Sequence, residues 1–155
     1  MRSDLFALQE SGSSPLVTAV IAIAVALLAS SLIAVAIKSK SGKLREGPGG
    51  SDEVQAPPGI ELSATGPTIV HFSAVWCGPC ASVRRVVDQV TADQPGVAHI
   101  EVDIDANPDA ARALSVLSLP TTFIFDATGR QAYRVSGVPK AADLRTALRG
   151  MTQPG

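Results

Sequence analysis

The chain has 155 residues, a formal net charge of -1 and 46% hydrophobic residues, with a positive mean hydropathy. This length allows one compact domain, and the balance of 13 basic and 14 acidic residues provides no positive field for nucleic acid, so we exclude that partner class. Two cysteines are too few to stabilise a small secreted scaffold through several disulfides.

After a short N-terminal tail, residues 1–15, the chain contains an uncharged apolar segment at residues 16–37, LVTAVIAIAVALLASSLIAVAI. As an α-helix rising about 1.5 Å per residue, it covers roughly the 30 Å hydrocarbon core of a bilayer. We interpret it as a transmembrane helix that anchors the chain in the cell membrane by a single pass.

Two alternatives for the apolar segment stay open. One is a buried helix of a soluble protein, although the segment has no polar face. The other is a cleaved signal peptide, for which Ala34 and Ala36 fit a cleavage site. A weakly basic start and a long apolar run favour the anchor.

Positive charges follow the apolar segment, at Lys38, Lys40, Lys43 and Arg45. By the positive-inside rule, we expect the domain that follows to be cytoplasmic. Residues 38–59 are rich in glycine, proline, serine and charge, and they cannot bury enough apolar surface to fold alone. We therefore expect a flexible basic tether.

Residues 60–150 alternate between strand and helix patterns, and residues 151–155 form a C-terminal tail. The β-branched run at 68–74 predicts a fully covered strand, and Pro79 suits the start of a helix that continues to residue 93. The remaining patterns predict a strand at 97–103, a helix at 107–116, a strand at 121–126, a hairpin partner at 130–137 and a helix at 139–150.

This order of elements predicts an α/β domain with helices on both faces of a mixed central sheet. The first strands should be parallel, because a helix connects them, and the last pair antiparallel, because a short turn connects them.

The stretch VWCGPCASV places Cys77 just before a helix and Cys80 in its first turn. Unpaired backbone amides and the helix dipole stabilise a thiolate at Cys77, which can attack a disulfide in a partner protein. Cys80, one turn away, can then resolve the mixed disulfide. Gly78 lets the backbone turn closely, and Pro79 fixes φ where no amide donor is needed. Trp76 is either a flat apolar surface beside the reactive sulfur or a packing residue.

A metal site and a purely structural disulfide are the alternative interpretations of the cysteine pair. His71 and His99 are the chain's two histidines, and their spacing from the cysteines matches no common zinc or iron–sulfur pattern. A disulfide across this short spacing closes a loop too small to stabilise much of the fold. We therefore predict dithiol chemistry with no metal and no separate cofactor.

Three motifs together resemble the thioredoxin family: WCGPC after an apolar strand, VDIDANPD one strand later, and SLPTTFIF about forty residues beyond Cys80. The resemblance covers about residues 60–150 and implies a thioredoxin-like fold. It implies that Cys77 is the attacking cysteine and Cys80 the resolving one. Membrane-anchored bacterial members of the family are the most similar group in organisation.

The resemblance also implies a substrate groove. Pro120 would be a cis-proline that lies against the disulfide and helps to hold a substrate strand, and the residues that line the groove would be Leu119, Thr121 and Gly137. An ordinary trans-proline before a strand is the alternative for Pro120.

Two positions depart from the family's pattern. His71 stands where many members have a buried aspartate, and Glu101 stands where a lysine often pairs with it. We hypothesise that His71 accepts or relays the proton of Cys80, with Glu101 orienting the imidazole or raising its pKa. A packed histidine without a chemical role is the alternative.

These observations favour a membrane-tethered thiol-disulfide oxidoreductase that reduces protein disulfides. It would receive electrons from an unidentified donor and serve electron transport and cell redox homeostasis. One alternative is an exported reductase for apocytochrome or other envelope thiols, although the interval between Cys80 and Pro120 leaves no room for the extra element common there. Another is a non-enzymatic binding module with the same fold.

Overall fold

The computed structural model describes residues 14–47 and 55–152. The chain divides into two compact units, Met1–Ser39 and Lys40–Gly155. Within the described residues, the first unit consists of one long helix, and the second contains the whole sheet and the helices that cover it.

The long helix α1 spans Pro15–Lys40. Proline suits the first position of a helix, and the alanine- and leucine-rich run behind it contains no glycine or proline to interrupt the turns. The part at Pro15–Ala36 is long and apolar enough to cross a membrane, and none of it is buried within the protein. It is therefore not the buried core helix that the sequence left open. A membrane anchor and a signal sequence both fit its position.

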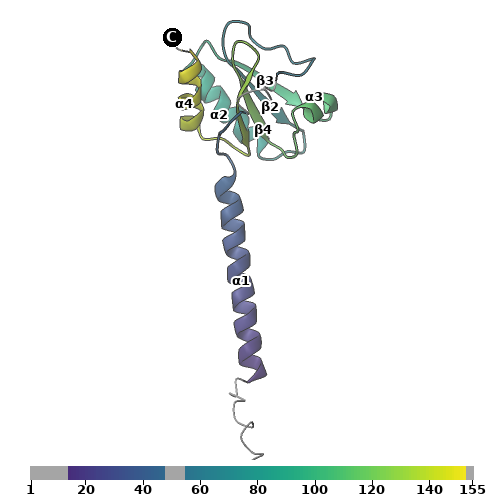
Figure 1. Cartoon of the computed structure of the whole chain (residues 1–155), viewed down its shortest axis with the longest axis vertical. Coiled ribbons are helices and arrows are strands. Elements are labelled where there is room, and N and C mark those ends of the chain that lie inside the picture. Colours follow the sequence, from purple (N-terminus) through teal and green to yellow (C-terminus); the bar gives the residue numbers. More distant parts are fainter. Residues whose placement is uncertain (1–13, 48–54, 153–155) are drawn as a thin grey trace, which may run out of the picture. The chain divides into compact units, whose positions relative to one another are not determined.

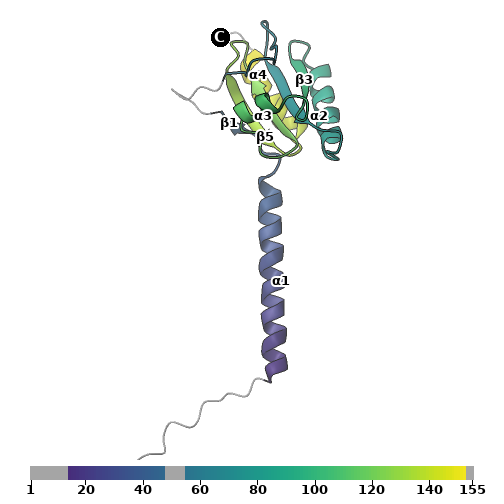
Figure 2. The same ribbon diagram turned by 90° about the vertical axis from the view of Figure 1, so that its right-hand side faces the viewer.

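The second unit contains a mixed sheet. Its strands are β1 (Arg45–Glu46), β2 (Thr68–Ser73), β3 (Ala98–Asp103), β4 (Thr121–Phe125) and β5 (Gln131–Ser136). The strand order is β1-β5-β4-β2-β3, and Figure 2 labels the two edge strands, β1 and β3. β2 pairs in parallel with β3 and antiparallel with β4, while β5 pairs antiparallel with β4 and β1. The predicted α/β fold with a mixed sheet is confirmed.

Helices cover both faces of the sheet (Figure 1). On one face, α2 (Cys80–Ala92) and α4 (Ala141–Thr152) enclose a buried aliphatic cluster that includes Ile69, Val83, Val87, Val90, Ile124, Leu144 and Leu148. On the other face, α3 (Pro108–Ala113) packs over Phe72, Phe123 and Phe125. Every residue of β2 is buried because both faces are covered, which explains its unbroken apolar pattern.

The segment that the sequence predicts as a flexible tether, residues 38–59, is structured in part. β1 pairs with the edge of β5, and the Gly42 and Gly47 amides donate 2.7 Å hydrogen bonds to the carbonyls of Ser136 and Ala132. Backbone groups at a sheet edge offer such pairing whatever the side chains of the incoming strand are. The expectation of a fully flexible tether is therefore wrong for residues 41–47, whereas residues 48–54 lie outside the described residues.

Candidate active site

The cysteine motif lies where β2 ends and α2 begins. β2 ends at Ser73, a short loop follows, and α2 begins at Cys80 with Pro79 at its N-cap. The Cys77 amide donates to the Ala74 carbonyl at 3.0 Å, and the Cys80 amide donates to the Cys77 carbonyl at 3.2 Å. These bonds tighten the loop into turns that lead directly into the helix, as the sequence predicts.

Cys77 and Cys80 form a disulfide with a Cα–Cα distance of 5.5 Å. Their exposure differs: Cys77 is half-buried, whereas Cys80 is 2% exposed. Cys77 is therefore the more accessible residue of the pair, and it directly precedes α2, whose N-terminal end favours a negative charge. Cys80 is covered by protein.

The residues beside the disulfide form an apolar surface. Val75 is 95% exposed and Trp76 is 68% exposed, so neither side chain is a core packing residue. The Trp76 indole Nε1 donates to Asp105 Oδ2 at 3.1 Å, which holds the ring against the loop that follows β3. Exposed apolar groups next to a reactive sulfur suit contact with a protein partner.

The predicted groove residues gather at the same end of the sheet. Phe72 near the end of β2 pairs with Thr121 at the start of β4, and Thr121 pairs with Ser136 at the end of β5. The Gly137 amide donates a 2.8 Å hydrogen bond to the Pro120 carbonyl. The segments that carry Pro120 and Gly137 therefore meet beside the point where the cysteine loop leaves β2.

The predicted groove residues differ in exposure. The Leu119–Pro120 peptide bond is cis, as the resemblance implies, and Gly137 has a φ of +89, which favours glycine. Leu119 and Gly137 are half-buried, whereas Pro120 is buried and Thr121 is 0% exposed, its hydroxyl donating to the Ser118 carbonyl at 2.7 Å. Thr121 therefore does not line an exposed groove, because β4 is covered on both faces.

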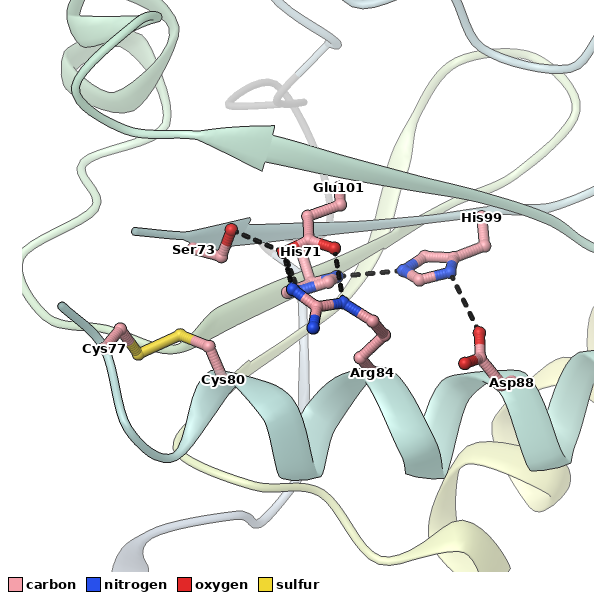
Figure 3. Close-up of polar contacts among 8 residues, drawn as sticks. All are labelled: His71, Ser73, Cys77, Cys80, Arg84, Asp88, His99 and Glu101. Atoms are coloured by element: carbon pink, nitrogen blue, oxygen red, sulfur yellow. Dashed lines mark hydrogen bonds and ion pairs between the residues drawn. A yellow bond between two sulfur atoms is a disulfide. The ribbon is translucent and has the colours of Figure 1, made fainter. Parts of the chain in front are cut away.

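Polar side chains from β2, β3 and α2 form a network behind the disulfide (Figure 3). The His71 imidazole is 0% exposed, and its Nδ1 lies 2.8 Å from His99 Nε2. His71 Nε2 lies 3.5 Å from Glu101 Oε1. Ser73 Oγ donates to the same carboxylate at 2.7 Å. His99, and not Glu101 as the sequence suggests, makes the hydrogen bond that orients His71.

The network shifts the pKa values of its members. Burial lowers the pKa of His71 from 6.5 to about 4, although the Glu101 charge acts in the opposite direction. Glu101 raises the pKa of His71 as expected, but burial has the larger effect and the net pKa falls. Hydrogen bonds from Arg84 lower the pKa of Glu101 from 4.5 to about 2, against the effect of burial.

Sequence reasoning missed four members of the network: Ser73, Arg84, Asp88 and His99, the last of which it considered only as a metal ligand. Arg84 and Asp88 contact Glu101 and His99. Their spacing was a usable signal, because Arg84 and Asp88 follow Cys80 at intervals of four residues and so share its helix face. Strand alternation likewise puts Ser73 on the same sheet face as His71. Among the described residues, no group of three or more His, Cys, Asp or Glu side chains could hold a metal ion.

Comparison with known proteins gives matches to one family. The thioredoxin family model matches residues 60–150. Thioredoxin from Mycolicibacterium smegmatis is 44% identical over 88 residues, which cover 54% of this chain and 78% of that protein. A bifunctional thioredoxin reductase/thioredoxin from Mycobacterium leprae is 38% identical over 86 residues, which cover 54% of this chain and 19% of that protein.

Solved structures give the same result. Chloroplastic thioredoxin z matches with a TM-score of 0.51 and 32% identity, covering 56% of this chain and 79% of that chain. A mutant thioredoxin from Halobacterium salinarum matches with a TM-score of 0.52 and 30% identity, covering 57% of this chain and 77% of that chain. The covered share corresponds in size to the sheet and its helices.

Proposed function

Because the chain belongs to the thioredoxin family and is a thiol-disulfide oxidoreductase with its own cysteine pair, we propose that it is a membrane-tethered reductase of protein disulfides. The unequal exposure of the two cysteine residues supports Cys77 as the attacking residue. Cys77 is half-buried at the start of α2, and Cys80 is 2% exposed.

The reaction proceeds in two exchanges. The Cys77 thiolate attacks one sulfur of a partner's disulfide, and the other partner sulfur leaves as a thiolate. The Cys80 thiolate then attacks Cys77, which forms the Cys77–Cys80 disulfide and releases the second partner thiol. The pair of electrons that reduces the partner comes from the dithiol, so no further cofactor takes part.

Leu119 and Gly137 present the substrate chain to Cys77. Both are half-buried at the end of the sheet from which the cysteine loop leaves. Pro120 shapes this surface from beneath, and Trp76 extends it. His71 serves the second exchange as the acceptor of the Cys80 proton, with Glu101 as its neighbouring charge.

Helix α1 holds the reductase at the membrane. Its apolar part, Pro15–Ala36, is exposed along its whole length, and a lipid bilayer is the environment that such a surface requires. The positive residues that follow the helix favour a cytoplasmic location for the reductase domain.

The electron donor is a reductase of the thioredoxin reductase type. Thioredoxins are reduced by such enzymes, and the relative from Mycobacterium leprae carries both names in one chain. A donor in the same compartment is required because the dithiol is consumed in each turnover.

Insulin reduction by the full chain in detergent micelles tests the function. With dithiothreitol as the donor, the wild-type chain should reduce insulin, and Cys77→Ser and Cys80→Ser should both be inactive. Cys80→Ser should accumulate a mixed disulfide through Cys77, while Cys77→Ser should not. An intact dithiol chain without activity would favour the binding module instead.

Topology needs a separate measurement. Reporters fused to Gly155 that are active on only one side of the membrane should be active in the cytoplasm, and the mass of the isolated chain should include α1. A chain that has lost α1, or a reporter active outside, would instead support a signal sequence and the exported reductase.

A further inference from the structure

Residues 41–47, here called the strap, lie along the edge of β5 in a fixed direction. The strap begins beside the last residue of β5, where the Gly42 amide donates a 2.7 Å hydrogen bond to the Ser136 carbonyl. It then runs antiparallel to β5 as β1, and the Gly47 amide donates to the Ala132 carbonyl at 2.7 Å. The chain therefore reaches the domain at the Ser136 end of β5 and runs away from that end.

The Ser136 end of β5 is also the active-site end of the sheet. There the Gly137 amide donates to the Pro120 carbonyl at 2.8 Å. The strap packs directly against this glycine, because a Cβ at Gly137 would lie 3.3 Å from the Gly42 nitrogen and 3.3 Å from the Ser41 Cβ. The first residues of the strap therefore border the groove proposed for the substrate chain.

The close fit of the strap depends on two glycines. A Cβ at Gly42 would collide with the Val138 carbonyl oxygen, and the φ of +78 at this position favours glycine as well. A Cβ at Gly47 would collide with the Gln131 carbonyl oxygen. A larger residue at either position must move one of the two backbones. The sequence of the strap therefore matches its docked position.

Four residues, 37–40, separate the strap from the apolar part of α1, which ends at Ala36. Even when fully extended, the chain from Ala36 to Ser41 spans at most about 18 Å. This limit follows from chain length alone and holds for every orientation of the domain. Because Gly137 packs against Ser41, the groove is held close to the end of the apolar part.

Docking of the strap sets this limit. The next described pairing along the chain is that of Gln55 with Arg130, at the hairpin between β4 and β5. If the strap were released, Gln55 would be the first paired residue, nineteen residues beyond Ala36. The limit would then rise to about 65 Å. The docked strap therefore removes most of the length that a released tether would have.

The charges of the strap suit an anionic surface. Lys43 and Arg45 are exposed, and they line a small recess that Arg134 of β5 also borders. Arg45 stands directly opposite Arg134 in the register of β1 and β5, and like charges in such a position repel each other. Anionic lipid headgroups attract basic residues beside a membrane span and would offset this repulsion. The strap therefore fits a position at the surface of a bilayer.

We propose that the docked strap holds the groove beside Cys77 at the membrane surface, so that the substrates of this reductase are disulfides of membrane proteins close to the bilayer. This inference rests on the membrane-tethered reductase function proposed above and adds the class of substrate. Tethering raises the effective concentration of Cys77 only for partners within its reach. A disulfide beside a membrane span lies within that reach, whereas one at the far end of a tall membrane protein does not.

Trp76 can report the distance between the groove and the bilayer, because it is the chain's only tryptophan and precedes Cys77 directly. In mixed vesicles of phosphatidylcholine and phosphatidylglycerol, energy transfer from Trp76 to dansyl-labelled headgroups measures this distance. The reduced full chain should show strong transfer. Insertion of about forty Gly/Ser residues between Lys40 and Ser41 should reduce the transfer by about half or more, because such a linker spans about 35 Å on average.

The insertion leaves every residue of the strap and the sheet in place, so the domain should fold as in the wild type. Flotation with the vesicles shows whether each chain is inserted. A wild-type chain that does not float would overturn the membrane tether, and this inference with it. Equal energy transfer in two floating chains would overturn this inference alone, and neither readout needs enzymatic activity.

The double variant Gly42→Ala/Gly47→Ala tests the strap itself. Both methyl groups collide with backbone carbonyl oxygens, so the strap should detach and its amides should exchange faster. Energy transfer from Trp76 should then fall below the wild-type value. Gly96→Ala is the matched control, because a Cβ there meets nothing within 4 Å. Detachment of the strap with unchanged transfer would contradict the proposal.

Substrate choice can be measured with two membrane-spanning peptides in the same vesicles. In the near peptide, the disulfide directly follows the membrane helix. In the far peptide, it ends a rigid continuation of that helix by about forty residues, about 60 Å above the bilayer. The wild type should reduce the near peptide about 10-fold faster or more, because the tether cannot span the distance to the far one. The insertion variant should reduce both peptides at similar rates.

Soluble insulin separates the substrate class from the reductase function. Insulin diffuses to the groove, so the wild type and the insertion variant should reduce it at the same rate. Loss of insulin reduction in the wild type would contradict the reductase function. Insulin reduction together with equal rates on the near and far peptides would contradict only the substrate class.

Discussion

Arg84 on α2 donates two hydrogen bonds to Glu101 on β3, from Nε at 2.8 Å and from Nη2 at 2.6 Å. This paired geometry fastens the helix that carries Cys80 to the strand beside His71. The two hydrogen bonds also fix the position of the Glu101 carboxylate next to the His71 imidazole. Without them, the flexible glutamate side chain could adopt other conformations.

The hydrogen bonds from Arg84 should be the main cause of the low pKa of Glu101. In Arg84→Gln, we expect the pKa of Glu101 to rise from about 2 toward its ordinary value of 4.5, because the largest cause of the shift is lost. Titration of the Glu101 carboxyl carbon by NMR measures this. Arg85→Gln is the control, since the Arg85 guanidinium contacts Ser82 and not Glu101. An unchanged Glu101 titration in Arg84→Gln would show that another group holds the carboxylate.

His71 should make stability depend on pH. The unfolded chain binds a proton at this residue near pH 6.5, whereas the folded chain binds one only near pH 4. Between these values the unfolded state binds more protons, so the free energy of unfolding rises with pH. A shift of this size corresponds to about 3 kcal/mol, which is present above pH 6.5 and lost as the pH falls to about 4.

Urea unfolding of the oxidised chain, followed by circular dichroism across this range, checks the effect of His71. In His71→Leu the slope between pH 6.5 and pH 4 should be much smaller. The interpretation of His71 as a buried neutral base fails if the variant and the wild type lose stability in parallel.

The two sulfurs should differ in reactivity once the disulfide is reduced. Iodoacetamide should label Cys77 at a pH where an ordinary thiol reacts slowly, because the N-terminus of α2 stabilises the thiolate. Cys80, 2% exposed, should stay unlabelled under the same conditions. Mass mapping of the labelled peptides gives the answer, with guanidinium-unfolded chain as the control in which both react. Equal labelling of both residues in the folded chain would contradict the assigned roles.

Gly47 should be required for the pairing of β1 with β5. A Cβ at this position would lie 2.3 Å from the Gln131 carbonyl oxygen, so Gly47→Ala must move one of the two backbones. Overpacking of this kind costs about 2 kcal/mol. We expect faster amide exchange along β1 and easier proteolysis of the segment. Gly96→Ala, which meets nothing within 4 Å, is the control and should behave as the wild type does.

Local patterns predicted most of the fold. The buried run at 68–74 corresponds to β2, and the valine stripe that follows Pro79 corresponds to α2, because strand and helix periods are visible in single segments. The burial of Thr121, by contrast, could not be predicted from the sequence. Its exposure depends on what covers β4, and no local pattern contains that information.

The pairing of residues 41–47 with β5 could likewise not be predicted from the sequence. Residues 41–47 have a composition typical of a tether, and their hydrogen bonds reach carbonyls about ninety residues further along the chain. The unpaired edge of β5 explains the difference, since it offers backbone donors and acceptors to any segment that can come close.

The sequence by itself determined the chemistry at Cys77 and Cys80, because two sulfurs at the start of a helix acquire their roles from the adjacent turn of backbone. Only the tertiary structure decided that His99, Asp88 and Arg84 surround His71. These residues come from three elements, and their meeting depends on strand register and on how α2 rests on the sheet. Such distances arise from the packing of the whole domain, so no single segment specifies them.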